Sequence, residues 1–490
     1  MKGAFLVAWS LVAVVACLRL DPIHRPLVAD NQLYFYLAER AASGTPPHVS
    51  HVDTKSQLGV LTTAAAIRAG RVLGADDVLS SRVVSIAAFA LALPLAAELG
   101  AVLTGSALAG HATAAALLGA RSLAEHAASG NNVKVFLLMF ALAAHLALAK
   151  RRDALAGLCA GAAFLCWQPG LLVVGAVGLE ALLARDGSLR RTGSLRRAAT
   201  VAAGASAAVC GYEFYFFAHG ALAAQWQQEF VMTLGSIHTP RRLLVSLRFL
   251  LHEGRDANAG MRILPLSFAL VAVVAVVAVG RWLLAPRQSA QQLCASTGWI
   301  SCAVAGLGAA AFTVYDHQGV PDLFFPDPYF ALSVAVVAAF VLAQAQRWGG
   351  TRGGWFAAVG LAAVLAIPVL RGTPRRPPLA FDLEDQRRLA AVLRGHSERG
   401  GDVWVYGAVH LLGLAHLDNH VPYGLFYDDV RSVLDVEAYR PLRDGRMPQL
   451  VVQMRGEIPG ASEYLASEYV EETPVEFRKQ GLKVWWRVGC

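Results

Sequence analysis

Long apolar stretches limit what this chain can fold into more than any other feature of its sequence. They are rich in Ala, Val and Leu, and many reach the roughly 18–20 residues that a helix needs to cross a bilayer. The hydrocarbon offers no water to backbone polar groups, and the alternation of a membrane barrel is absent, so we expect helices. The stretches lie at 3–20, 82–104, 106–124, 132–149, 154–167, 170–184, 198–218, 262–284, 297–314, 329–346 and 354–370.

Composition agrees with a multi-pass membrane protein. Of the 490 residues, 56% are hydrophobic and only 16% are charged, too few for the surface of a soluble protein of this size. The net charge of +8 comes from Arg residues near the ends of the stretches, where they orient helices. No basic face with interleaved aromatic residues is present, so we expect membrane lipids and no nucleic acid as partners.

The basic clusters predict an orientation. With Met1 in the cytoplasm and an uncleaved first helix, about eleven crossings would put every dense basic cluster on the cytoplasmic side. The chain would then lie in the cytoplasmic membrane, with its C-terminus outside. The outer loops would be 21–81, 219–261 and 315–328.

The chain changes character after the last apolar stretch. Pro374, Pro377 and Pro378 mark a linker, and charged residues become frequent beyond it. An amphipathic pattern at 383–393 predicts a helix, and short β-prone runs predict strands. We therefore expect an all-α polytopic membrane bundle at 1–372 and a small α/β extracytoplasmic domain at 376–490. The predicted strands lie at 402–406, 449–454 and 483–488.

The first outer loop is the most polar part of the predicted bundle. Leu33, Leu37 and Ala41 predict a helix from Asp30 to Ser43 that lies on the bilayer surface, with Glu39 and Arg40 facing water. Asp30 can cap free N–H groups at the start of that helix. A capping carboxylate can also face a cavity, so the cap and a chemical role are compatible.

The whole arrangement resembles the GT-C class of membrane glycosyltransferases, particularly bacterial relatives of protein O-mannosyltransferases and the aminoarabinose lipid A transferase. The resemblance includes the early Asp in a long outer loop and the outer α/β domain, and it covers essentially the whole chain. It implies transfer of a hexose or pentose from a polyprenyl-phosphate donor to a lipid, glycan or protein acceptor. The local segments that carry it are Ser81-Arg82-Val83, Gly130-Asn131-Asn132, Trp167-Gln168-Pro169 and Phe325-Pro326-Asp327-Pro328-Tyr329-Phe330.

In that class an early loop aspartate is the proposed general base, and Asp30 is the matching residue. A carboxylate within hydrogen-bond reach can take the proton of a hydroxyl as the glycosidic bond forms. Cations would stabilise the departing phosphate. The candidates for contacts with substrate or phosphate are Lys55, Arg82, His51, Arg241, Arg242, Asp316 and His317. Simpler roles are open to some of them: Lys55 could contact lipid headgroups, and Asp316 and His317 could end a helix in water.

The sequence differs from the class at two acidic positions. Asn31 follows Asp30 where many members have Glu, and Asn131-Asn132 precede the fourth span where many have an acid. Asp53 or Glu125 could supply the missing carboxylate.

His48, His51 and Asp53 could ligate a metal, but no regular helix face organises them. A divalent metal is therefore possible but not favoured, and no cofactor is certain. Loop histidines that are solvated or contact substrate explain His48 and His51 more simply.

Two other functions remain open at this point. A transporter or flippase would carry ionisable residues in mid-span and related halves, whereas Glu98, Arg121 and Glu180 lie near predicted span ends. A non-catalytic envelope scaffold would use the outer domain for binding. Convergence of Asp30, Lys55 and the third outer loop on one cavity would favour the enzyme, and their dispersal would favour the scaffold.

Overall fold

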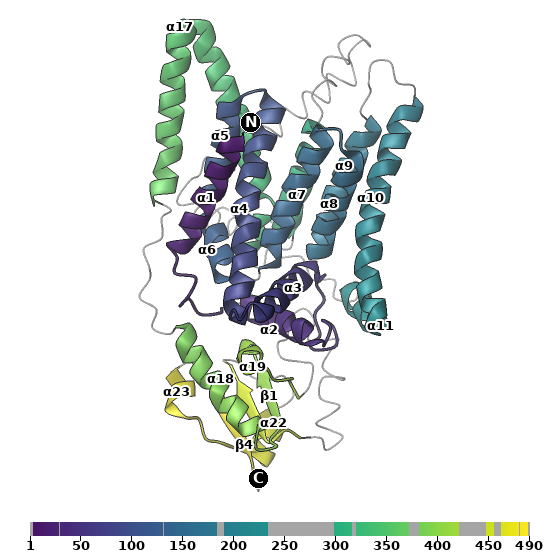
Figure 1. Cartoon of the computed structure of the whole chain (residues 1–490), viewed down its shortest axis with the longest axis vertical. Helices are drawn as coiled ribbons and strands as arrows, with labels where there is room; N and C mark the ends of the chain where they lie inside the picture. The colour runs from purple at the N-terminus through teal and green to yellow at the C-terminus, as the bar shows by residue number, and fades with distance from the viewer. Residues whose placement is uncertain are drawn as a thin grey trace.

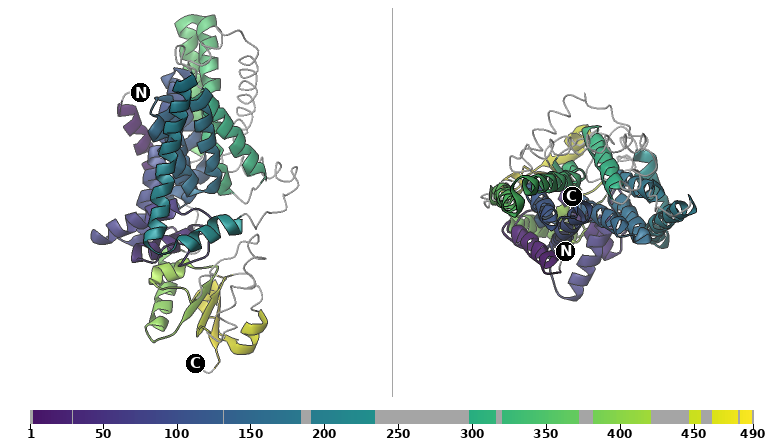
Figure 2. Two further views of the ribbon diagram at one scale, coloured as in Figure 1. Left: turned by 90° about the vertical axis from the view of Figure 1, so that its right-hand side faces the viewer. Right: turned by 90° about the horizontal axis from the view of Figure 1, so that it is seen from above.

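The structure, a computed structural model, is a helical bundle with a small sheet beyond one end (Figure 1). The N-terminus lies toward the opposite end of the bundle from the C-terminus (Figures 1 and 2). The described residues are 3–28, 30–130, 132–183, 191–233, 298–315, 320–371, 382–420, 447–454, 462–479 and 481–488.

The bundle core consists mostly of Ala, Leu and Val side chains, which let neighbouring helices approach closely. Its last helix is bent at Gly350, where a positive φ of 60° turns the chain into a hairpin that projects away from the sheet (Figure 1). The bundle helices are α1 (Gly3–Leu18), α4 (Asp77–Thr104), α5 (Ala107–Leu118), α6 (Arg121–Ser129), α7 (Val133–Ala149), α8 (Asp153–Cys166), α9 (Leu171–Leu183), α10 (Arg191–Ala218), α16 (Trp299–Tyr315) and α17 (Asp327–Arg371).

These helices confirm a polytopic helical fold, while the number of crossings stays a prediction. Among the described residues, 3 helices are long and apolar enough to span a bilayer, or up to 4 if a bent pair counts as one span. The predicted stretch 106–124 is not one helix, because α5 ends at Leu118 and the Arg121–Glu125 pair begins α6. The predicted span at 262–284 lies outside the described residues.

Two short helices lie across the end of the bundle that faces the sheet (Figure 1). They are α2 (Asp30–Ser43) and α3 (Leu58–Val72), and α2 has the bounds that the sequence predicted. The prediction that Glu39 and Arg40 face water is wrong, since both are buried. The C-terminal domain, called the outer domain here for its predicted place outside the membrane, covers them, a contact that local periodicity cannot reveal.

The outer domain has a 4-stranded sheet in the order β1-β2-β4-β3. β1 pairs with β2 in parallel, with Val403 opposite Leu450, and the other two pairings are antiparallel. The predicted helix and three strands are confirmed, and β3 is additional. The elements are α18 (Leu383–Ser397), β1 (Val403–Tyr406), α19 (His410–Ala415), β2 (Leu450–Gln453), α22 (Ser462–Glu468), β3 (Tyr469–Glu471), α23 (Val475–Lys479) and β4 (Lys483–Arg487).

One hydrophobic core joins the outer domain to the surface helices. Leu33 and Leu37 of α2 belong to the same buried cluster as Leu393 of α18 and Leu412 of α19. The outer domain is therefore packed against the helices that begin at Asp30, so it can influence where that residue lies.

The contact between α8 and α10 gives a test of the packing. A side chain on Gly157 would overlap the carbonyl oxygen of Val201, whereas one on Gly178 of α9 would meet nothing. We expect Gly157→Ala to destabilise the protein by about 1–3 kcal/mol. Gly178→Ala should be neutral or slightly stabilising, because Ala is the better helix former. Thermal unfolding in detergent measures both, and equal melting temperatures would contradict this packing.

Candidate functional site

Asp30 and Lys55 lie together at the end of the bundle that faces the sheet (Figure 1). Asp30 is the first residue of α2, and Lys55 lies in the loop between α2 and α3. The Lys55 Nζ is 3.7 Å from Asp30 Oδ2 and donates a hydrogen bond of 3.2 Å to the Tyr34 hydroxyl. The Asp30 side chain is 29% exposed and that of Lys55 14%. The structure thus pairs the predicted base with a predicted cation, and both side chains are partly exposed to solvent.

Asp53 shapes the turn that presents Lys55. Its Oδ1 accepts a hydrogen bond of 3.2 Å from the Lys55 backbone N–H, and its Oδ2 accepts one of 2.8 Å from Gln57 Nε2. Asp53 is only 2% exposed, so both carboxylate oxygens act inside the loop. Burial also raises the pKa of Tyr34, which keeps the hydroxyl beside Lys55 protonated.

The loop predicted as the second outer loop holds the predicted first outer loop in place. A π-helix, η2 (Gln227–Met232), follows α11 (Leu222–Trp226) and carries Gln228 and Glu229. His48, at a positive φ of 67°, has its Nδ1 2.9 Å from Gln228 Oε1 and its Nε2 2.9 Å from Glu229 Oε1. Gln228 Nε2 in return donates to the His48 carbonyl at 2.8 Å. The Lys55 loop is therefore fixed by contacts that leave Asp30 untouched.

His51 and His48 are buried, so they are not the solvated loop histidines that the sequence suggested. His51 Nδ1 lies 2.6 Å from the Val52 carbonyl oxygen. Burial lowers the pKa of His51 to about 4, although the nearby Asp53 carboxylate opposes the shift. A contact between His51 and substrate stays a prediction without geometric support.

Arg82 is also buried, a little more than one turn inside α4. Its guanidinium donates to the carbonyls of Pro22, Ile23 and Arg25 in the loop after α1, and to that of Ser129 at the end of α6. These bonds direct its donors at backbone oxygens. Arg82 therefore holds the segment that leads to Asp30, and we do not assign it to phosphate.

A second charged pair lies next to this region. Lys134 of α7 forms a buried ion pair with Asp322 of the 3-10 helix η3 (Val320–Phe324), and its Nζ is 4.3 Å from the centre of the Trp167 ring. Gln168, the residue after Trp167, donates from its Nε2 to the Thr54 carbonyl at 2.5 Å, which links this pair to the Lys55 loop. Asp322 belongs to the predicted third outer loop and places a carboxylate beside the start of α7, where the sequence lacks one.

Sequence reasoning did not select Lys134, although a signal was available. A lysine just inside an apolar span is costly unless it has a partner or a role. Its partner could not be identified, because Asp322 is 188 positions away.

Of the remaining predicted residues, only Glu125 lies in the part of the chain that the structure describes. Glu125 Oε1 accepts a hydrogen bond of 2.9 Å from Arg121 Nε, so this acid already has a cation. Arg241, Arg242, Asp316 and His317 lie outside the described residues.

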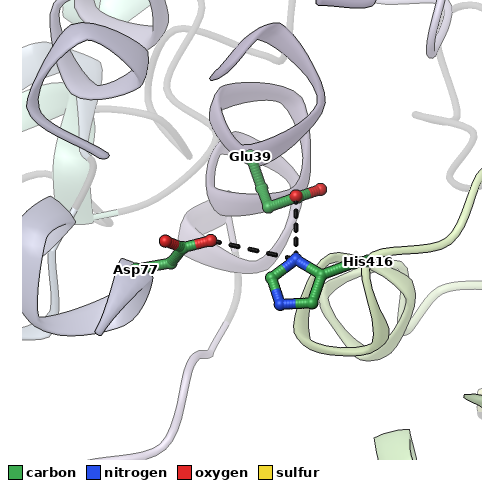
Figure 3. Close-up of side chains that lie close together, drawn as sticks. All are labelled: Glu39, Asp77 and His416. Atoms are coloured by element: carbon green, nitrogen blue, oxygen red, sulfur yellow. Dashed lines mark hydrogen bonds and ion pairs between the residues drawn. The ribbon is translucent and has the colours of Figure 1, made fainter. Parts of the chain in front are cut away.

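Glu39, Asp77 and His416 form a further cluster, between α2, the start of α4 and the residue after α19 (Figure 3). These are residue types that bind metals. However, Arg71 supplies a positive charge, with its Nη2 2.7 Å from both Glu39 Oε1 and Asp77 Oδ2. Burial would raise the pKa of Glu39, but hydrogen bonds from His416, Ser43 and Arg71 lower it. We interpret the cluster as an ion-pair network between the bundle and the outer domain.

His51 predicts a pH-dependent stability. Its pKa is about 4 when folded and about 6.5 when exposed, so the unfolded chain takes up a proton first as the pH falls. The contribution of the neutral His51 to the free energy of unfolding is fully present above about pH 6.5. It is lost as the pH falls toward 4, by up to about 3 kcal/mol. Melting temperatures of His51→Gln should fall less steeply than wild type between pH 7 and 4.5. The exposed His219→Gln is the control, and an unchanged slope in His51→Gln would contradict the assignment.

The pair of Lys134 and Asp322 predicts non-additive stability. Removing one partner leaves a buried unpaired charge, which costs roughly 3–5 kcal/mol, whereas replacing both with apolar residues is often neutral. We expect Lys134→Met and Asp322→Leu each to lower the melting temperature, and the double variant to recover most of the loss. A double variant as unstable as the sum of the single ones would show that the two side chains are not paired.

No family model and no curated protein sequence matches this chain. Its structure is similar to that of ArnT from Cupriavidus metallidurans bound to undecaprenyl phosphate, with a TM-score of 0.58, 14% identity, and 100% of this chain and 99% of that chain covered.

A second similar structure is the archaeal oligosaccharyltransferase AglB from Archaeoglobus fulgidus, in complex with an inhibitory peptide and a dolichol-phosphate. There the TM-score is 0.50 at 11% identity, over 98% of this chain and 74% of that one. Both are GT-C class membrane glycosyltransferases. The resemblance predicted from the sequence is therefore confirmed for the fold: the chain has the fold of the GT-C membrane glycosyltransferases.

Proposed function

We propose that this protein is a membrane glycosyltransferase that moves a sugar from a polyprenyl-phosphate donor to a hydroxyl of a lipid, glycan or protein acceptor. The observation that carries the proposal is the partly exposed pair of Asp30 and Lys55, 3.7 Å apart, at one end of a GT-C-like bundle. A base for the acceptor hydroxyl and a cation for the departing phosphate are two groups that this transfer needs.

The chemistry follows from those two groups. Asp30 accepts the proton of the acceptor hydroxyl while the oxygen forms a bond to the anomeric carbon. The bond from that carbon to the phosphate oxygen breaks, and the electron pair leaves with the phosphate. Lys55, held by the turn at Asp53 and beside the Tyr34 hydroxyl, stabilises the growing negative charge.

The other charged residues support the site without taking part in bond making. Arg82 and Asp53 fix the two segments that carry the pair. The ion pair of Lys134 and Asp322 lies beside Trp167, and the next residue, Gln168, donates to the Thr54 carbonyl in the Lys55 loop. This proximity of the predicted third outer loop to Lys55 supports the enzyme over the scaffold. We place the site on the outer face of the cytoplasmic membrane, with residues 376–490 as an extracytoplasmic domain beside the bundle of residues 1–372.

A transporter receives less support. Glu180 is buried, as an ion-pathway residue could be, but its carboxylate accepts the backbone N–H groups of Gly298 and Ser301 at the start of α16. This is the ordinary way to satisfy free donors at a helix start, so Glu180 needs no role in transport.

The test is transfer from radiolabelled polyprenyl-phosphate sugars by purified protein in proteoliposomes, with hexosyl and pentosyl donors. We expect Asp30→Asn to lower the rate by roughly 10²–10⁴-fold, because the base is lost. Lys55→Met should lower the rate and weaken binding of polyprenyl phosphate, because the phosphate loses its cation. Asp402→Asn, at an exposed aspartate of the outer domain, is the control that should behave as wild type.

No transfer by wild type from any donor would contradict the function. Transfer that persists in Asp30→Asn would keep the function and remove the assignment of the base.

A further inference from the structure

The segment that leads to Asp30 is held from two directions. From the bundle, Arg82 donates to the carbonyls of Pro22, Ile23 and Arg25. From the outer domain, the Leu383 N–H at the start of α18 donates to the His24 carbonyl at 2.9 Å. The residues just before the proposed base are therefore tied to both parts of the molecule.

Gln386 makes the most specific of these contacts. It is 2% exposed, its side-chain oxygen accepts from the Leu27 N–H at 2.9 Å, and its Nε2 donates to the Leu27 carbonyl at 2.9 Å. One side chain thus satisfies both polar backbone groups of a fully buried residue, three positions before Asp30. A capping box between Asp382 and Asp385 fixes the start of α18, so Gln386 is presented from a rigid helix.

The outer domain also holds α2 on the other side of Asp30. The Asn419 N–H donates to the Tyr36 hydroxyl at 3.1 Å, and Arg40 lies 2.7 Å from Asp418. Glu39 is buried and bonded to His416 at 3.0 Å (Figure 3). Contacts before and after Asp30 therefore come from one domain.

We propose that the outer domain sets the position of the general base, and that Gln386 is the positioning residue that does so. The proposal rests on the proposed function and adds a part of the machinery to it. Lys55 is fixed separately, through Asp53, Gln57 and the second outer loop. Gln386 therefore controls how far Asp30 lies from Lys55 without touching either side chain.

The physical reason is the cost of unpaired buried groups. Without the Gln386 amide, the Leu27 N–H would stay buried and lose its hydrogen bond, which is costly. The Leu27 carbonyl would keep only the weaker of its two side-chain bonds, from Gln32 Nε2 at 3.1 Å. The segment can recover part of this cost only by moving toward water, which would carry Asp30 with it. A displacement of about 1 Å at a base is enough to slow a reaction by about 100-fold.

The test variant is Gln386→Met, which keeps the length of the side chain and removes both polar atoms. Its control is Arg388→Met on the same helix, at a side chain that is 70% exposed. We expect Gln386→Met to lower kcat by roughly 10- to 100-fold with little change in KM for the donor, because Lys55 is unaffected. Arg388→Met should match wild type.

A second readout does not depend on catalysis. Hydrogen–deuterium exchange of the peptide that contains residues 22–30 should be faster in Gln386→Met than in Arg388→Met, while the peptide that contains Lys55 stays unchanged. Unchanged exchange at 22–30 would overturn the proposal, whatever the activity. Faster exchange with unchanged kcat would also overturn it and leave the proposed function intact. No transfer by the wild type would overturn both.

Discussion

A loop that carries reactive side chains at a membrane surface needs hydrogen-bond partners for its backbone polar groups. In this protein the buried guanidinium of Arg82 supplies several of them. Arg82 bonds to the carbonyls of Pro22, Ile23 and Arg25 and to that of Ser129. It thereby joins α4, the end of α6 and the loop after α1. The position of Asp30, and so the geometry of the site, depends on this junction, because unsatisfied carbonyls there would be costly.

Patterns within a segment predicted much of the fold. The bounds of α2, the helix at 383–393 and three of the four strands follow from periodicity and propensity, which act over a few residues. The break between α5 and α6 was not predicted, because Ala-rich sequence stays apolar across it. Burial of Glu39 and Arg40 was not predicted either, since it depends on a domain more than 300 positions away.

In the candidate site, too, residue types could be predicted from the sequence, whereas contacts between distant segments could not. Asp30 and Lys55 could be selected because their residue types suit a base and a cation, and the structure places them together. Arg82 suits a phosphate equally well by type, but its surroundings direct its donors to backbone carbonyls. The pairing of Lys134 with Asp322 is a contact between distant segments, and a single sequence contains no signal for it.

Exposure separates the two carboxylates that could serve as the base. Asp53 is 2% exposed and receives hydrogen bonds on both oxygens from its own loop, so an acceptor hydroxyl would have to displace one of them. Asp30 is 29% exposed, and Lys55 lies 3.7 Å from it. When a donor phosphate binds, it can compete for the same ammonium group, which would free the Asp30 carboxylate to accept a proton. One lysine could in this way link donor binding to the availability of the base.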